Sequence, residues 1–177
     1  MKKVLVAAAA ALFGSAPAHA ALGVGSKAPD FTLQASLGGK VFTFSLAEAL
    51  KTGPVVLYFY PAAFTKGCTL EAHNFAEAAD QFEALGATII GVSHDDIDTL
   101  NRFSVSECRN KFAVAADADR TVMKKYDAVL LWKYANRTTY VIAPDGTILL
   151  AYTALSPYDH VRLSLEAIKR WKVANPP

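Results

Sequence analysis

The segment Tyr58-Phe-Tyr-Pro-Ala-Ala-Phe-Thr-Lys-Gly-Cys68 is the most informative part of the chain, because an apolar run ends in it and a helical pattern begins in it. The run from Pro54 to Tyr60 is rich in β-branched and aromatic residues, which predicts a strand buried on both faces. After Cys68 the apolar residues recur at helical spacing as far as Gly86, which predicts the end of the helix. We therefore expect Cys68 in the first turn of a helix that follows a buried strand.

The predicted position of Cys68 favours a reactive thiolate. A helix N-terminus carries roughly half a positive charge and unpaired N–H groups, and both stabilise an anion. Cysteines in such positions ionise more readily than free cysteine, and the thiolate is the nucleophilic form. We interpret Cys68 as a candidate nucleophile.

The rest of the chain alternates strand and helix patterns. Glycines 38 and 39 predict a hairpin turn, Ser45-Leu-Ala-Glu48 predicts a capping box, and Ser156-Pro157 predicts the N-cap and first residue of the last helix. Predicted strands cover residues 41–44, 54–60, 88–93, 112–115, 138–142 and 147–152, and helices follow at 45–51, 68–85, 96–108, 119–126 and 157–171. This order predicts an α/β thioredoxin-like fold with a central mixed β-sheet flanked by helices.

Residues 1–20 have the pattern of a signal peptide. Met1-Lys2-Lys3 is basic, residues 4–13 form an apolar core too short to span a bilayer, and Ala18-His19-Ala20 is a small-x-small cleavage site. We expect export to the periplasm with cleavage after Ala20, which leaves residues 21–177 as one domain. No later stretch predicts a membrane span.

Charge and cysteine content narrow the function classes. The net charge of +2 includes Lys2 and Lys3, so the mature chain is close to neutral and gives no electrostatic reason to expect nucleic-acid binding. Two cysteines cannot form a disulfide framework, and a domain of this size does not need one. Since a disulfide can persist after export, at least one cysteine is expected to have a redox or nucleophilic role.

The residues Pro61, Thr65 and Cys68 have the spacing Pro-x-x-x-Thr-x-x-Cys and resemble the active-site signature of peroxiredoxins. The longer phrase from Phe59 to Glu71 is similar to the PrxQ (bacterioferritin-comigratory protein) branch of the AhpC/TSA family. The resemblance implies a thiol-dependent peroxidase that acts on hydrogen peroxide and organic hydroperoxides through a sulfenic acid at Cys68. It also implies an external thiol reductant of the thioredoxin-like kind, no cofactor, and a monomer or weak homodimer.

Arg137 and Glu71 are the charged candidates for the site. Arg137 begins the phrase Arg-Thr-Thr-Tyr-Val-Ile, which resembles a peroxiredoxin segment whose arginine contacts the cysteine sulfur and the peroxide. Peroxide reduction puts negative charge on the leaving oxygen, which a fixed cation stabilises. Without the resemblance, Arg137 would be interpreted as an exposed residue at a strand end. Glu71 matches the family's Cys-Thr-x-Glu and is expected to orient charged neighbours, although a glutamate on a helix surface is the commoner case.

Three further residues of the motif have a structural and a functional interpretation. The Thr65 hydroxyl is placed to donate to the sulfur or to a substrate oxygen, or simply to cap the helix. Pro61 is expected to cover the thiolate from one side, and it also ends the strand. Gly67 is expected to permit close approach of the backbone to substrate.

The resolving thiol is the open question of the sequence. His73 stands five residues after Cys68, where many PrxQ proteins have their resolving cysteine, so this chain departs from that pattern. Some PrxQ proteins carry it on the helix predicted at 96–108, which makes Cys108 the tentative resolving residue. The alternative is a half-buried structural cysteine. If the two Cα atoms lie more than roughly 7 Å apart, a bridge requires unwinding of the Cys68 helix.

Three other function classes were weighed against a peroxidase. A zinc site built from Cys68, His73, His94 and Cys108 has spacings that fit none of the usual zinc patterns. A thiol–disulfide oxidoreductase needs Cys-x-x-Cys, and Thr65 occupies the first cysteine position. A non-catalytic binding module, with both cysteines structural, remains an alternative.

Overall fold

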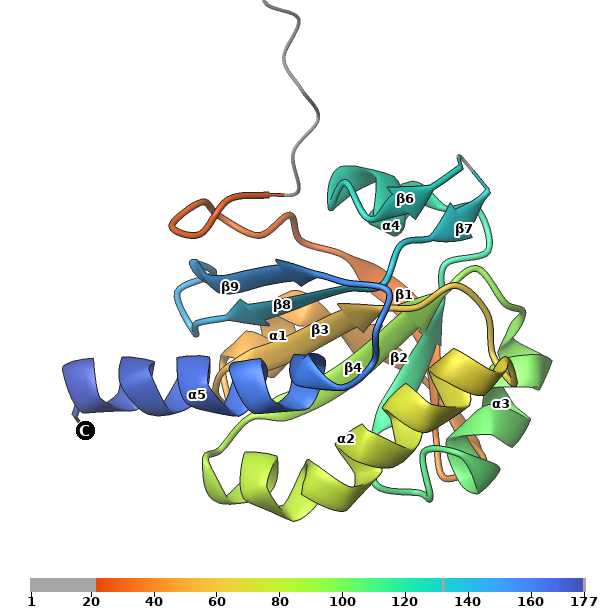
Figure 1. The fold of residues 1–177 in the computed structure, drawn as a ribbon, viewed down its shortest axis with the longest axis horizontal. Helices are drawn as coiled ribbons and strands as arrows, with labels where there is room; N and C mark the ends of the chain where they lie inside the picture. The colour runs from red at the N-terminus through yellow and green to blue at the C-terminus, as the bar shows by residue number, and fades with distance from the viewer. Residues whose placement is uncertain (1–21, 132, 177) are drawn as a thin grey trace, which may run out of the picture.

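The computed structural model describes residues 22–131 and 133–176, and these residues fold around a seven-stranded mixed sheet (Figure 1). The predicted signal peptide lies outside the described residues. The sheet has the order β2-β1-β5-β4-β3-β8-β9, and a separate two-stranded sheet joins β6 and β7. The strands are β1 (Thr32–Leu37), β2 (Lys40–Ser45), β3 (Val55–Phe59), β4 (Thr88–Ser93), β5 (Ala113–Ala116), β6 (Val129–Leu130), β7 (Tyr134–Ala135), β8 (Thr138–Ile142) and β9 (Ile148–Thr153). The helices are α1 (Leu46–Leu50), α2 (Lys66–Ala84), α3 (Ile97–Ser106), α4 (Thr121–Lys125) and α5 (Asp159–Ala174).

Strand β3 is the most enclosed part of the sheet. All five of its residues are buried, and it pairs in parallel with β4 and antiparallel with β8. Because successive side chains of a strand point to opposite faces, Leu57 and Phe59 enter one apolar core while Tyr58 and Tyr60 enter the other. The predicted strand buried on both faces is confirmed.

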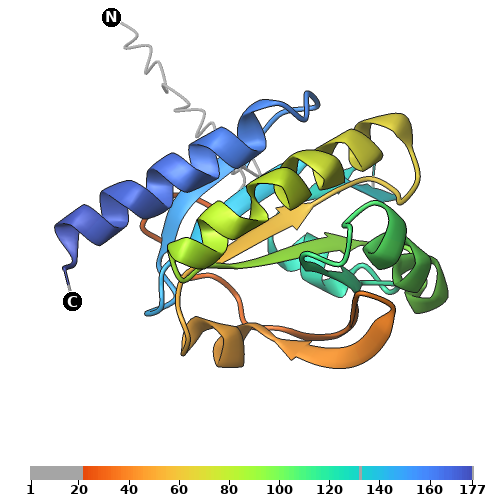
Figure 2. The ribbon, with the colours of Figure 1, turned by 90° about the horizontal axis from the view of Figure 1, so that it is seen from below.

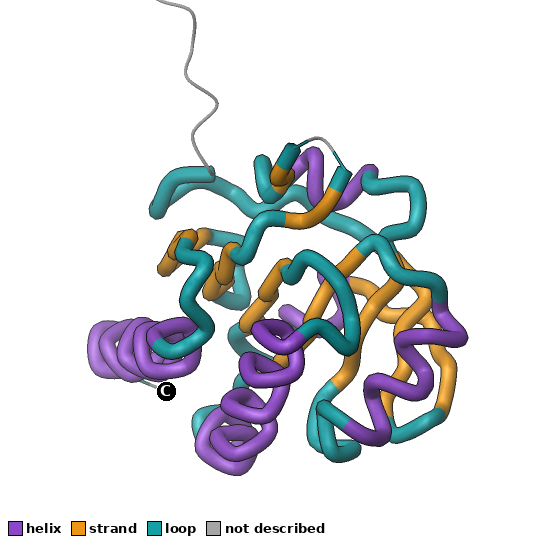
Figure 3. The backbone as a smooth tube through the Cα atoms, turned by 45° about the vertical axis from the view of Figure 1, so that its right-hand side comes forward, coloured by secondary structure: helices purple, strands orange, loops and turns teal. Residues whose placement is uncertain are grey.

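Helices cover both faces of the sheet, as the sequence predicts. The core that contains Tyr58 and Tyr60 is closed by α2, α3 and α5, and α2 and α5 lie side by side (Figure 2). The opposite core is closed by α1 and α4. Figure 3 shows the strands between α4 and the layer formed by α2, α3 and α5. In residues 22–131 and 133–176, none of the helices is long and apolar enough to cross a bilayer.

The predicted hairpin turn at the start of the domain is confirmed. Gly38 and Gly39 join β1 to β2 with φ values of 54° and 81°, in the left-handed region that favours glycine. Of the predicted capping box, only the Ser45 half forms: Ser45 accepts a hydrogen bond of 3.3 Å from the backbone N–H of Glu48, whereas the Glu48 carboxylate pairs with Lys51.

Two of the differences between the predicted and observed helix boundaries bear on the site. Helix α3 ends at Ser106 rather than at Cys108, because Arg109 and Asn110 adopt left-handed conformations that end the helix. Helix α5 begins at Asp159, so the predicted cap at Ser156 and Pro157 is wrong. The loop before α5 instead bends and brings the backbone carbonyls of Ala154 and Leu155 to the site described below. The small sheet of β6 and β7 was not predicted.

Candidate active site

Cys68 is the third residue of α2 and is 2% exposed. The chain leaves β3, turns at Phe64 with a left-handed φ of 61°, and enters the helix after Thr65. This strand–loop–helix order places the thiol in the first turn, as predicted, against the core that contains Tyr58 and Tyr60. Cys68 therefore lies among the unpaired backbone N–H groups at the N-terminus of α2, where a negative charge on the sulfur is stabilised.

Arg137 reaches Cys68 from the neighbouring strand. Phe59 at the end of β3 pairs with Thr138 at the start of β8, so the residue before Thr138 lies beside the β3–α2 loop. The Arg137 Nη2 atom donates to the Cys68 Sγ atom across 3.6 Å, and Nε donates to the carbonyl of Leu155 at 2.9 Å. Arg137 is 5% exposed, so its interpretation as an exposed strand-end residue is wrong.

Gly67 gives the arginine room. A Cβ atom at position 67 would lie 2.9 Å from the Arg137 Nη2 atom, closer than real Cβ contacts come. The sequence predicted a close approach of the backbone to substrate at this position. The structure shows a close approach of the backbone to the guanidinium that contacts the sulfur.

Glu71 holds the other end of the same guanidinium. Its carboxylate pairs with Arg137 Nη1, and the residue is fully buried on the inner face of α2. The surface interpretation of Glu71 is therefore wrong, and its predicted place beside charged neighbours is what the structure shows. Burial raises the pKa of the Glu71 carboxyl to about 8, since loss of solvation outweighs the attraction of Arg137.

The sequence analysis did not identify His160 and Thr139, which lie next to the Arg137–Glu71 pair. His160, in the first turn of α5, has its Nδ1 atom 3.7 Å from Glu71 Oε1 and 2.7 Å from the hydroxyl oxygen of Thr139. Its Nε2 atom is 3.1 Å from the carbonyl of Ala154. The available signal was helical spacing, because His160, Ser164 and Ile168 share the buried face of α5.

Thr65 and Pro61 lie in the loop that leads to Cys68. The Thr65 hydroxyl donates to the carbonyl of Ala62 at 3.0 Å and makes no side-chain cap, so the capping interpretation is wrong. Pro61 is partly buried two residues after β3. The predicted roles of Thr65 toward substrate and of Pro61 as a shield stay predictions.

Cys108 lies just beyond α3 and is fully buried in the same apolar cluster as Cys68. Both cysteines are free thiols. Burial, followed by the nearby negative charge of Glu107, raises the pKa of the Cys108 thiol far above its ordinary value. The tentative resolving role of Cys108 stays a prediction, and the thiol as it stands is a poor nucleophile.

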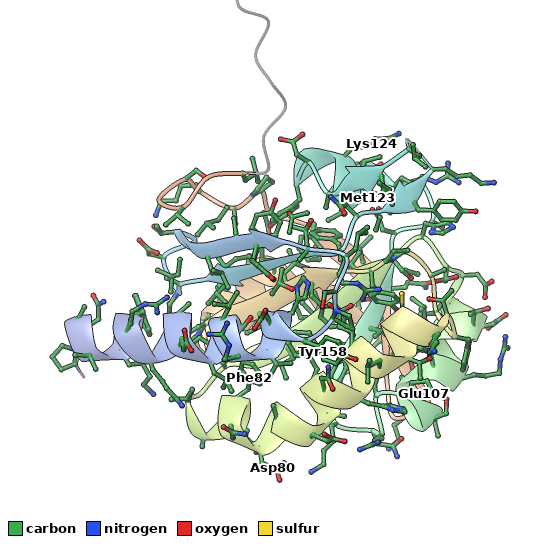
Figure 4. The ribbon with its side chains drawn as sticks, in the orientation of Figure 1. Asp80, Phe82, Glu107, Met123, Lys124 and Tyr158 are labelled. Atoms are coloured by element: carbon green, nitrogen blue, oxygen red, sulfur yellow. The ribbon has the colours of Figure 1, made fainter. Side chains whose placement is uncertain are left out.

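The two histidines of the rejected zinc set have other surroundings. His73 on α2 has its Nε2 atom 2.8 Å from Oε2 of Glu107, the residue that follows α3. Figure 4 labels Glu107 beside α3. The His94 ring packs edge-on against Tyr134 at 5.2 Å between centroids. In the part of the chain that the structure describes, no group of three or more His, Cys, Asp or Glu residues is arranged to hold a metal ion.

Known proteins resemble this chain over most of its length. Residues 24–151 match the AhpC/TSA family. Peroxiredoxin Q, chloroplastic, of Gentiana triflora is 34% identical over 148 residues, which cover 82% of this chain and 66% of that protein. The putative peroxiredoxin bcp of Helicobacter pylori is 33% identical over 154 residues, covering 83% of this chain and 98% of that protein. This chain thus spans just under two thirds of the chloroplastic relative and nearly all of the bacterial one.

Solved structures of peroxiredoxins also superpose on this chain. The crystal structure of peroxidoxin BcpB from Mycobacterium tuberculosis superposes with a TM-score of 0.76 at 32% identity, over 83% of this chain and 96% of that one. Mycobacterium tuberculosis AhpC superposes with a TM-score of 0.78 at 21% identity, which supports the fold alone. The predicted thioredoxin-like fold with a central mixed sheet is confirmed. Because the family match covers more than half of the chain, and relatives above 30% identity cover more than four fifths of it, this chain belongs to the AhpC/TSA family of peroxiredoxins.

Proposed function

We propose that this protein is a thiol-dependent peroxidase that reduces hydroperoxides at Cys68. The observation that carries the proposal is the contact of 3.6 Å between the Arg137 guanidinium and the Cys68 sulfur, at the start of a helix. Peroxiredoxins are thiol peroxidases, so membership of the AhpC/TSA family supports this function over disulfide exchange or a non-catalytic binding role.

The first chemical step needs a thiolate and a stabilised leaving oxygen. The Cys68 thiolate attacks one peroxide oxygen, the O–O bond breaks, and the second oxygen leaves with the bonding electron pair. The sulfur becomes a sulfenic acid, and the leaving oxygen takes up a proton to depart as water or an alcohol. The Arg137 guanidinium is the fixed cation beside this charge, and its planar donors can face sulfur and oxygen together.

Recycling needs two electrons from outside the chain. In the proposed route the Cys108 thiol condenses with the sulfenic acid, which forms a disulfide and releases water. An external dithiol, of the thioredoxin-like kind, then reduces the disulfide and is itself oxidised. Because both cysteines are buried, we expect local opening around α2 or the end of α3 to accompany the condensation and to give the reductant access to the disulfide.

The proposal includes the cellular setting expected from the sequence. The signal-peptide pattern of residues 1–20 supports export to the periplasm, where peroxide would be met outside the cytoplasm. A monomer or weak homodimer is proposed as the working form, and light scattering on the mature protein tests it.

A paired assay tests the proposed activity. Purified protein with a thiol reductant is given hydrogen peroxide or an organic hydroperoxide, and peroxide consumption is followed. Insulin reduction is followed beside it with the same protein. We expect peroxide consumption without insulin reduction. Insulin reduction without peroxide consumption would favour a disulfide oxidoreductase, and neither activity would favour a binding module.

A further inference from the structure

A second buried cluster lies directly behind Arg137. It consists of Glu71 from α2 and His160 from α5, both fully buried, with the Thr139 hydroxyl from β8 beside them. Glu71 Oε2 faces Arg137, whereas Oε1 faces His160 Nδ1 at 3.7 Å. Among the described residues, Oε1 has no hydrogen-bond partner within normal distance. Glu71 therefore connects the Arg137 guanidinium, which contacts Cys68, to the His160 imidazole, which takes no part in the peroxidase step described above.

The surroundings of His160 decide where its protons lie. The carbonyl of Ala154 can only accept, so the Nε2 atom 3.1 Å away carries a proton. In the neutral ring the Nδ1 atom then has a lone pair, to which the Thr139 hydroxyl can donate at 2.7 Å. The Nδ1 position is the one that can gain a second proton, and it faces Glu71.

When Cys68 is a thiolate and Glu71 a carboxylate, the single positive charge of Arg137 does not neutralise both, and one more proton is needed. A Cys68 thiolate and a Glu71 carboxylate would place two negative charges on one guanidinium, in a site closed to water. An uncompensated buried charge is costly. His160 is the only other basic group within ion-pair distance of Glu71 among the described residues.

We propose that Glu71 and His160 hold one proton between them, and that this shared proton allows the Cys68 thiolate to form beside the Arg137–Glu71 pair. His160 is thus a positioning residue for the peroxidase reaction, acting on Cys68 through Glu71 and Arg137. The inference rests on the proposed function of Cys68. The net charge of the pair is zero whichever of the two holds the proton, so the positive charge of Arg137 remains available to the sulfur.

The groups that face His160 agree with this assignment. Burial raises the pKa of Glu71 to about 8. Burial lowers the pKa of His160; the hydrogen bond to the Ala154 carbonyl opposes this, and the positive charge of Arg137 adds to the lowering. Both shifts favour a pair with a single proton near neutral pH. The exposed Asp159, the preceding residue on α5, opposes the His160 shift, and the Tyr152 ring of β9 packs edge-on at 4.8 Å.

The test measures thiolate formation rather than peroxide turnover. In a Cys108→Ser background only Cys68 can react, and the rate of its alkylation by iodoacetamide is measured against pH. The variant His160→Gln keeps a donor for Ala154 but cannot hold the second proton. We expect it to raise the midpoint pH of Cys68 alkylation by about one unit. An unchanged midpoint in the folded variant overturns the proposal.

Two comparisons separate charge balance from packing. In a Glu71→Gln background no carboxylate needs the shared proton, so adding His160→Gln should leave the midpoint nearly unchanged. The same shift in both backgrounds would also overturn the proposal. Ser164→Ala is the packing control, because the Ser164 hydroxyl donates to the His160 backbone carbonyl at 2.7 Å and does not touch the ring. It should affect stability without moving the midpoint.

If His160→Gln does not fold, the proposal can still be tested on a protein that keeps both Glu71 and His160. Nitrogen chemical shifts of the His160 ring are followed against pH in the reduced protein and in Cys68→Ser. The negative thiolate strengthens proton binding by the pair, so the pair should release its proton at lower pH in Cys68→Ser. Identical titrations contradict the inference. Alkylation of Cys68 that proceeds normally without peroxidase activity would contradict the proposed function and leave the pair intact.

Discussion

The two cysteines lie in one apolar cluster but in opposite electrostatic surroundings. Cys68 begins a helix and contacts the Arg137 guanidinium at 3.6 Å. Cys108 follows the end of a helix, next to the carboxylate of Glu107, and both burial and that charge raise the pKa of its thiol. A helix N-terminus and a cation favour a thiolate, whereas a helix C-terminus and an anion oppose it.

Burial alone therefore does not determine whether a cysteine is reactive. Both thiols are almost completely buried. Only Cys68 has a partner that stabilises negative charge, so peroxide should react there. The raised pKa of the Cys108 thiol makes it a poor nucleophile as it stands, so we expect its segment to open before it reacts with a sulfenic acid. The following predictions test that division of roles.

The largest effect is expected from Cys68→Ser, which should abolish peroxide consumption because it removes the nucleophile. Cys108→Ser should still consume one equivalent of peroxide per chain, since the first step does not use it. Mixing each reduced variant with peroxide and counting equivalents consumed distinguishes them. Activity near wild type in Cys68→Ser, with loss in Cys108→Ser, would mean that the roles are reversed.

A smaller effect is expected from Arg137→Lys. The lysine keeps a positive charge but loses the planar donors that contact the sulfur, Glu71 and the carbonyl of Leu155. The second-order rate constant with hydrogen peroxide should fall about 10²- to 10³-fold, as for loss of one oxyanion donor. Stopped-flow kinetics measure it, with circular dichroism as the check on folding. An unchanged rate constant would remove Arg137 from the site.

The sequence predicted the Cys68 side of this comparison better than its charged partners. The strand–turn–helix order around Cys68 follows from local patterns, because apolar runs and helical spacing are encoded over a few residues. The pairing of Glu71 with Arg137, and His160 behind them, depends on strands and helices far apart in the chain. Helical spacing places Glu71 on the same face as Phe75 and Phe82, and His160 on the buried face of α5, but it does not indicate that the two side chains meet. The predicted start of α5 is wrong for a related reason, since the carbonyl of Leu155 in the preceding loop accepts a hydrogen bond from Arg137 of another element.

An effect on stability is expected from the titration of Glu71. Its pKa is raised from 4.5 to about 8 in the folded protein, so the folded state binds this proton more tightly than the unfolded chain. The resulting stabilisation is complete below about pH 4.5 and is lost as the pH rises to about 8. Relative to Glu71→Gln, the free energy of unfolding of the unaltered protein should fall across this window by on the order of a few kcal/mol.

Urea denaturation at several pH values between 4.5 and 8.5 measures that difference. Glu48→Gln is the matched control, because Glu48 is exposed and pairs only with Lys51 on the surface. Its difference from the unaltered protein should stay nearly constant with pH. Parallel curves for Glu71→Gln and the unaltered protein would show that Glu71 does not titrate in this range.

The smallest effect concerns the contacts that hold Cys108 in place. Glu107 pairs with His73 of α2 at 2.8 Å, and Lys111 pairs with Asp80 of the same helix at 2.8 Å. The two pairs bracket Cys108 and tie its segment to the helix that carries Cys68. Glu107→Gln should weaken this attachment and let the segment open more often. Because a partly exposed side-chain pair of this kind contributes about 0.2–1 kcal/mol, the Cys68–Cys108 disulfide should form up to about fivefold faster after one equivalent of peroxide.

Timed acid quenching followed by non-reducing peptide mapping gives the rate of disulfide formation. Lys111→Gln is the graded comparison, since that pair is more exposed than the pair of Glu107 and His73 and should matter less. A disulfide that forms at the same rate in all three proteins would show that opening of this segment does not limit the step. Sulfenic acid that persists at Cys68 with Cys108 still free would instead make an external thiol the resolving group. The two cysteines would then differ not only in reactivity but in whether they take part at all.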